Sequence, residues 1–197
     1  AQFITEIQTI ISRNLSSNDP ALITVGSIHG GYAGNVIPDK VELKLTIRTY
    51  SDSSRKLILK RIKEIGDHLA LAAGLAEDKL PVYDLGDMSI PSVYNSPQLG
   101  EFLSDFVKTQ FGGKAIVEVK PVMIGEDFGV YGQQASKIPS YLMWTGTVAQ
   151  KRKATALHDA SVTPSLHSSH FAPDIEETLT KNLPMLEDCL LQLFNKK

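Results

Sequence analysis

The sequence has 197 residues, which is enough for one large domain or two small ones. Hydrophobic residues make up 42% and charged residues 21%, as in ordinary soluble globular proteins. We expect a cytoplasmic location, and the low cysteine content fits the cytosol and export equally well. The net charge of -2 argues against a broad basic surface for nucleic acid or an anionic membrane, and no apolar run is long enough to span a bilayer. The single cysteine, Cys189, excludes an intrachain disulfide and is expected to be a buried core residue.

The first 85 residues predict a small α+β domain. Apolar residues at helical spacing predict helices, and the alternation of Val41, Leu43, Leu45 and Ile47 with polar residues predicts a half-buried strand. The expected elements are a helix over 1–15, antiparallel strands over 22–29 and 41–49, a helix capped by Asp52 to Ser54 and ending near Gly74, and a strand over 80–85. Because the order opens on a helix, we expect a first strand to be missing from this domain.

Residues 86–197 alternate helices and strands, which predicts an α/β domain. Ser96 followed by Pro97 is a typical helix start, and Asp174 with Glu177 resembles a capping box. The expected elements are a linker over 86–94, a helix from Ser96, a strand over 115–119, a turn and short helix over 125–134, a buried strand over 141–147, a polar loop over 150–163 and a final helix from Asp174.

Arg48 lies on the polar face of the second predicted strand, directly after a glycine-rich connection. A planar guanidinium on a sheet face suits bidentate binding of a carboxylate. The alternative is a solvated strand arginine with no ligand, and the spacing of the residues alone favours this alternative.

Two further places carry side chains suited to chemistry. His167 and His170 follow a loop and precede the last helix; histidine is the commonest metal ligand, yet a loop histidine is often a surface residue, and zinc needs three or four protein ligands. Glu126 and Asp127 stand at the start of a short helix, where they either complement the helix dipole or face a substrate or metal pocket. The pair Glu176 and Glu177 is assigned to the first turn of the last helix, and His158 with Asp159 lies in the polar loop.

Three motifs, in chain order, resemble a known family. They are ITVGSIHGGYAGNVIPDKVELKLTIRT at 23–49, GEDF at 125–128 and LHSSHF at 166–171. They are similar to motifs of the co-catalytic zinc exopeptidases and deacylases, which include N-acyl-L-amino acid amidohydrolases, hippurate hydrolases and glutamate carboxypeptidases. The resemblance implies a lid, or dimerisation, domain over 1–85 and the C-terminal part of a zinc-exopeptidase-like α/β catalytic domain over 86–197.

The resemblance also implies roles for five residues. Asn35 and Arg48 match substrate-binding residues of the lid, and Glu126 and Asp127 match an acidic pair in the substrate pocket. His167 matches a metal ligand of a centre that holds two zinc ions, although Ser169 replaces the usual proline of that motif. The implied substrates are N-acyl amino acids or small peptides, and the implied partner is a second copy bound through the lid.

The same resemblance identifies what these residues do not contain. Family enzymes carry most metal ligands and the general base in an N-terminal half-domain, which has no match in this sequence. We therefore expect the C-terminal portion of a zinc-dependent amidohydrolase, with no catalytic residue of its own and no activity alone. The alternative is a non-catalytic dimerising or ligand-binding module derived from such an enzyme.

Overall fold

The computed structural model describes residues 1–86, 89–134, 138–148 and 165–195. The predicted polar loop, with His158 and Asp159, lies outside the described residues. The chain forms two compact units: unit 1 contains residues 1–93 and 121–133, and unit 2 contains residues 94–120 and 134–197. Helices and a small sheet are both present, which confirms the predicted mixed α/β class.

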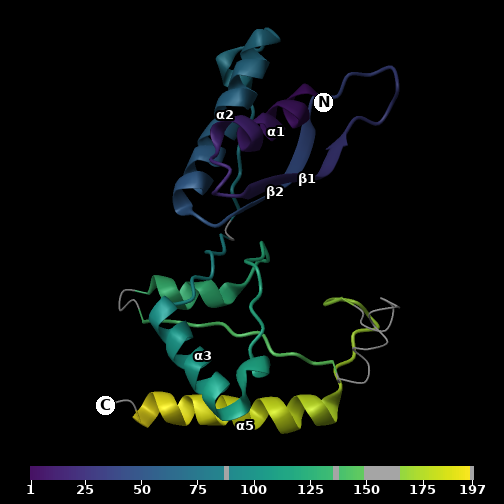
Figure 1. The fold of residues 1–197 in the computed structure, drawn as a ribbon. Helices are drawn as coiled ribbons and strands as arrows, with labels where there is room; N and C mark the ends of the chain where they lie inside the picture. The colour runs from purple at the N-terminus through teal and green to yellow at the C-terminus, as the bar shows by residue number, and fades with distance from the viewer. Residues whose placement is uncertain (87–88, 135–137, 149–164, 196–197) are drawn as a thin grey trace. The chain divides into compact units, whose positions relative to one another are not determined.

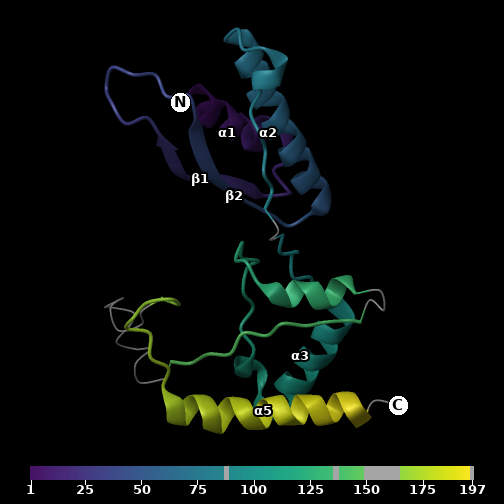
Figure 2. The same ribbon diagram turned by 180° about the vertical axis from the view of Figure 1, so that it is seen from behind.

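Unit 1 contains helix α1 (Gln2–Asn14), strand β1 (Ala21–Gly30), strand β2 (Val41–Thr49) and helix α2 (Asp52–Ala72), so four predicted elements are confirmed. The strands are antiparallel, with Ala21 opposite Thr49 and Gly30 opposite Val41. A bulge between Val25 and Ser27 interrupts the register. Both helices lie against one face of this two-stranded sheet (Figures 1 and 2).

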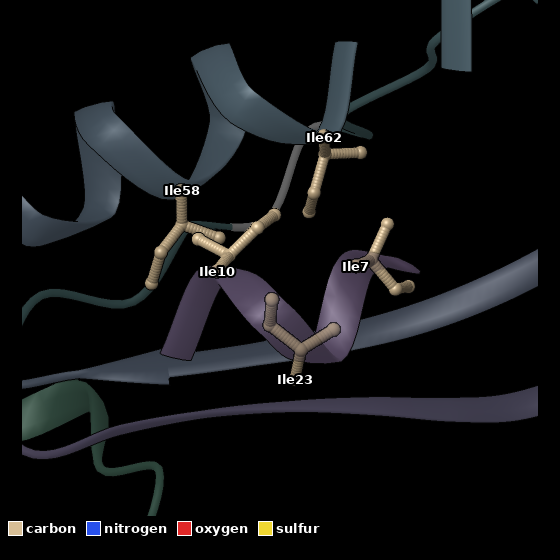
Figure 3. Packing of buried hydrophobic residues seen from close by; sticks show 5 residues of the cluster. All are labelled: Ile7, Ile10, Ile23, Ile58 and Ile62. Carbon is tan, nitrogen blue, oxygen red and sulfur yellow. The ribbon is translucent and has the colours of Figure 1, made fainter. Parts of the chain in front are cut away.

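Five isoleucines form the core of unit 1 (Figure 3). Two come from α1, one from β1 and two from α2: Ile7, Ile10, Ile23, Ile58 and Ile62. Their spacing of three or four residues within each helix puts both members of a pair on the same helix face. The β-branched side chains have few rotamers and pack at high density, so this cluster fixes how the two helices lie on the sheet.

The start of α2 is capped by a serine one residue before the cap predicted at Asp52 to Ser54. Ser51, and not Asp52, is the N-cap residue, and its Oγ accepts a hydrogen bond of 3.1 Å from the backbone N–H of Ser54. Ser51 also donates to Asp19 Oδ2 over 2.7 Å, and the Ser54 hydroxyl donates to the same oxygen. Asp19 therefore ties the α1–β1 connection to the positive end of the α2 dipole.

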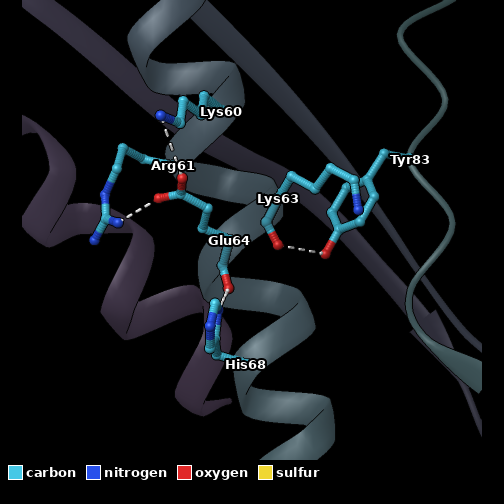
Figure 4. Close-up of polar contacts among 6 residues, drawn as sticks. All are labelled: Lys60, Arg61, Lys63, Glu64, His68 and Tyr83. Atoms are coloured by element: carbon cyan, nitrogen blue, oxygen red, sulfur yellow. Dashed lines mark hydrogen bonds and ion pairs between the residues drawn. The ribbon is translucent and has the colours of Figure 1, made fainter. Parts of the chain in front are cut away.

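The predicted strand over 80–85 is wrong: a 3-10 helix, η1 (Glu77–Lys79), is followed by irregular chain. The reason is the docking of Tyr83 on α2, where its ring lies against Gly66 (Figure 4 shows Tyr83 beside this helix). The Tyr83 hydroxyl shares its proton between the Lys63 carbonyl oxygen at 3.2 Å and Asp67 Oδ1 at 3.1 Å. Residues 80–85 are therefore held by side-chain hydrogen bonds to α2, whereas the prediction expected backbone hydrogen bonds to a neighbouring strand.

Unit 2 is built on helix α3 (Pro97–Phe111) and helix α5 (Ile175–Asn195), as predicted. Ser96 caps α3, accepting from the Leu99 N–H over 3.4 Å, and Pro97 occupies the first turn. The buried hydrophobic residues in the described part of this unit are Leu103, Val107 and Cys189, which confirms the core position expected for the cysteine.

The predicted strands over 115–119 and 141–147 are wrong, since the sheet in the described part of the chain consists of β1 and β2 alone. A 3-10 helix, η2 (Gly113–Ala115), takes the start of the first segment. In the second, both backbone polar groups of Leu142 bond to the side chain of Asn95, at 2.8 and 3.0 Å. An asparagine side chain satisfies these groups in place of a neighbouring strand, and Trp144, predicted to be buried, is 56% exposed.

Helix α5 has apolar side chains that the described part of unit 2 leaves exposed. Six large apolar side chains at helical spacing are exposed by 36% to 84%: Ile175, Leu179, Leu183, Leu186, Leu190 and Phe194. Charged residues are interspersed along the helix, and none of the described helices is both long and apolar enough to cross a membrane.

Candidate functional site

Arg48 is exposed near the end of β2, on the face opposite the isoleucine core, as the alternating pattern predicted. Its guanidinium is directed to the backbone of a distant segment, because Nη1 donates a hydrogen bond to the carbonyl oxygen of Met123. Met123 lies three residues before Glu126, in the stretch 121–133 that belongs to unit 1. The fold thus brings the predicted carboxylate-binding arginine next to the segment that contains the acidic motif.

Glu126 precedes and Asp127 begins the 3-10 helix η3 (Asp127–Gln133), and both side chains are exposed. Glu126 Oε1 accepts a long hydrogen bond of 3.4 Å from the Phe128 N–H, and the Glu126 carbonyl accepts one of 3.4 Å from Gly129. Glu126 therefore acts partly as the local cap that the alternative reading described. Asp127 adds a second exposed negative charge at the same point.

Asn35 lies in the exposed connection between β1 and β2. The connection begins at Gly31, whose φ of 77° is open to glycine and strained for most other residues. Two large apolar side chains flank Asn35 and are almost fully exposed, Tyr32 at 90% and Ile37 at 92%. The loop therefore presents an amide between two apolar groups.

His167 lies in a turn of unit 2 and is exposed. Its φ of 67° is the only positive value at a non-glycine residue in the described part of the chain. Backbone hydrogen bonds from Ser168 to Ser165 (3.1 Å) and from Phe171 to Ser168 (3.0 Å) enclose it in consecutive turns. Histidine tolerates this left-handed conformation better than most residues, and such backbone strain is concentrated at functional sites.

The described residues do not make a complete metal site. No group of three or more histidine, cysteine, aspartate or glutamate side chains in this part of the chain is arranged to hold a metal ion. A zinc site needs three or four protein ligands, and His167 supplies one. The ligand set present therefore does not by itself fit the two zinc ions implied by the sequence motifs.

The partner of Arg48 could not be predicted from the sequence. A backbone carbonyl such as that of Met123 has no residue-type signature, and the two residues are 75 positions apart. The same holds for Ser92, whose hydroxyl bonds to the backbone at the end of β2. Both belong to contacts between segments remote in sequence, where periodicity carries no signal.

Comparison with known proteins identifies relatives in sequence and in structure. A family model described as a peptidase dimerisation domain matches residues 1–73. The chain is 35% identical over 170 residues to the N-acetyldiaminopimelate deacetylase of Streptococcus sanguinis (strain SK36), covering 86% of this chain and 42% of that protein. It is 34% identical over 166 residues to the N-acetyldiaminopimelate deacetylase of Bacillus subtilis (strain 168), covering 82% of this chain and 40% of the relative.

A solved structure agrees with these matches. A protein named as an aminohydrolase, from methicillin-resistant Staphylococcus aureus, superposes with a TM-score of 0.72 and 25% identity. The match covers 97% of this chain and 44% of that one. The chain thus spans less than half the length of the relatives it matches.

Proposed function

The chain belongs to the aminoacylase-like family of amidohydrolases and peptidases, and from this premise we propose that it is part of an enzyme that hydrolyses the amide bond of N-acyl amino acids. The observation that carries the proposal is the 35% identity to a named deacetylase over 86% of this chain. A stretch of 170 residues out of 197 includes the motif at 125–128 and most of the motif at 23–49. Because the chain covers 42% of that relative, we propose that the active enzyme is a longer protein.

Arg48 binds the carboxylate of the substrate in this proposal. It is exposed near the end of β2, and the planar fork of donors of a guanidinium matches a carboxylate. A guanidinium has five N–H donors and Nη1 uses one for the neutral Met123 carbonyl, so Arg48 can bind an ionised carboxylate, the stronger acceptor, while it keeps that bond. Asn35, Glu126 and Asp127 contact the rest of the substrate; no residue of this chain is assigned as the general base.

The test compares substrates with and without a carboxylate. In the full-length enzyme, Arg48→Ala should raise KM for hippurate or N-acetyl amino acids by about 10- to 100-fold, the range expected when a charged hydrogen bond is lost. KM for an N-acyl amine without a carboxylate should change little. Lys44→Ala is the matched control, because Lys44 is an exposed cation on the same face of β2. Equal effects of Arg48→Ala on both substrate classes would refute the role.

Metal dependence is the second part of the proposal. We propose about two zinc ions per chain of the full-length enzyme, with His167 as one ligand and the others outside the residues described in the structure. Zinc bound there would act as a Lewis acid on the amide carbonyl. Elemental analysis of the purified full-length protein tests this directly, and a metal content near zero after purification without chelators would refute it.

A pair of variants separates the imidazole of His167 from its unusual backbone. Asparagine also tolerates a positive φ, so His167→Asn should remove the ligand and keep the turn, whereas His167→Ala removes the ligand and strains the turn. Both variants should lose about half of the bound zinc, and only the alanine variant should also lower the melting temperature. Full zinc content in His167→Asn would exclude the histidine as a ligand.

We further propose a homodimer formed through residues 1–73, the region that matches the peptidase dimerisation domain. Native mass spectrometry of the full-length protein and of a variant deleted for this region should give a dimer and a monomer, respectively. The expected location in the cytoplasm stays a prediction.

A further inference from the structure

The end of β2 is a point where three segments of unit 1, remote in sequence, are bonded to one another. Arg48 donates to the Met123 carbonyl. The Ser92 hydroxyl lies 3.1 Å from the carbonyl oxygen of Thr49 and 2.9 Å from that of Tyr50. A hydroxyl has a single proton, so Ser92 shares it between the two carbonyls that follow Arg48. The backbone around residue 92 is thus tied to the strand end that carries the arginine.

Gly129 connects the third segment to the same place. It is buried in η3, and a Cβ atom added to it would lie 2.7 Å from the Pro91 carbonyl oxygen and 3.0 Å from that of Ser92. Real Cβ atoms essentially never come within 3.0 Å of such atoms, and the atoms met here belong to backbone that cannot rotate away. The absence of a side chain at Gly129 therefore allows η3 to lie directly on the backbone of residues 91–92.

These contacts hold the acidic motif at both ends. Met123 is bonded to Arg48. Gly129 packs against the backbone of residues 91–92, and the Ser92 hydroxyl bonds to the end of β2. Glu126 and Asp127 lie between the two anchors. Three residues span at most about 11 Å of chain, so the Cα atom of Glu126 lies within about 11 Å of that of Met123.

We propose that Ser92 and Gly129 are positioning residues, which hold the Glu126–Asp127 segment at a fixed place relative to Arg48 so that both act on one substrate. Neither residue need touch the substrate. This inference rests on the proposed function for its kinetic consequence, whereas the anchoring itself is independent of any activity. A displacement of about 1 Å at a binding group lowers activity severely, which makes such anchoring effective.

The kinetic test uses the full-length enzyme and hippurate. Gly129→Ala and Ser92→Ala should each raise KM about tenfold with kcat within about twofold, because they displace a binding group and not the reacting bond. Ser92→Thr, which keeps the hydroxyl, should restore KM. The controls are Gly113→Ala, where a Cβ meets nothing within 4 Å, and Ser89→Ala at an exposed serine three residues before Ser92.

A double-mutant cycle distinguishes positioning from general damage. If Gly129 acts by holding the acidic segment beside Arg48, then Gly129→Ala in an Arg48→Ala background should raise KM by less than twofold more. Full additivity of the two KM effects, or a loss confined to kcat, would overturn the proposal.

Hydrogen exchange gives a second measurement that needs no substrate. Peptides covering residues 121–133 should exchange faster in Gly129→Ala and Ser92→Ala than in the parent protein, and at the parent rate in both control variants. Unchanged exchange in Gly129→Ala and Ser92→Ala would overturn the anchoring. If the enzyme hydrolysed no N-acyl amino acid, the proposed function would fail, while this experiment would still decide whether the segment is anchored.

Discussion

Ile58 offers a sharp test of how unit 1 is held together. It is fully buried between α1, β1 and α2, in contact with the other isoleucines of the core (Figure 3). Ile58→Ala removes three carbon groups at about 0.8 kcal/mol each, or about 2.4 kcal/mol of burial. The cavity left behind adds about 1–2 kcal/mol, so a loss of about 3–4 kcal/mol is expected. Unit 1 should remain folded only if its total stability exceeds that amount.

The matched control for this variant is Ile28→Ala in β1. It deletes the same atoms from a side chain that is 53% exposed, and about 1 kcal/mol or less is expected. Amide exchange of α2 peptides, read by mass spectrometry, reports the opening free energy of this unit separately from unit 2. Equal losses in the two variants would show that the isoleucine cluster is not the core that stabilises α1 and α2 on the sheet.

Three further predictions concern local features. Hydrogen bonds, led by that from Ser54, hold the pKa of Asp19 below its usual 3.8. The ionised carboxylate therefore stabilises the folded state above pH 3.8, and this contribution is lost as the pH falls through the lowered pKa. Asp19→Asn should remove this acid dependence of the free energy of unfolding, measured from urea unfolding curves. Gly66→Ala, which in an ordinary helix is stabilising, should here destabilise by about 1–3 kcal/mol because the new methyl meets the Tyr83 hydroxyl; an increase in melting temperature would contradict the docking of Tyr83. Burial raises the pKa of the Cys189 thiol, so it should react with a disulfide reagent only after unfolding, and rapid reaction of the native protein would contradict its core position.

The sequence predicted those elements whose signal is local and long. Helices α1, α2, α3 and α5 each have apolar residues at helical spacing over 13 residues or more, and β2 alternates over nine residues; each is present, and β1 pairs with β2 despite its bulge. The three wrong strands, at 80–85, 115–119 and 141–147, are short apolar runs. A strand exists only when another strand pairs with it, and that partner is a property of the whole fold. Side chains took its place in two cases: Tyr83 docked on α2, and Asn95 bonded to Leu142.

In the candidate site too, features set by neighbouring residues were predictable and contacts between remote segments were not. The exposure of Arg48 follows from the alternation of β2, whereas the turn that contains His167 was not predicted from the sequence. The bond from Arg48 to the Met123 carbonyl follows from neither, because it depends on where a segment 75 residues away is held. No composition or spacing rule predicts a contact between a side chain and a remote backbone atom.

That dependence has a consequence for how function is distributed in unit 1. If the orientation of Arg48 were set only by its strand, substitutions outside β2 would leave carboxylate binding unchanged. The guanidinium instead bonds to residue 123, and the strand end behind it bonds to residue 92. In the proposed site, Ser92 and Gly129 would therefore act on the arginine and on the acidic segment through the contacts at residues 91 and 92, without touching the substrate. On this proposal, the functional unit is the set of three joined segments rather than any one motif.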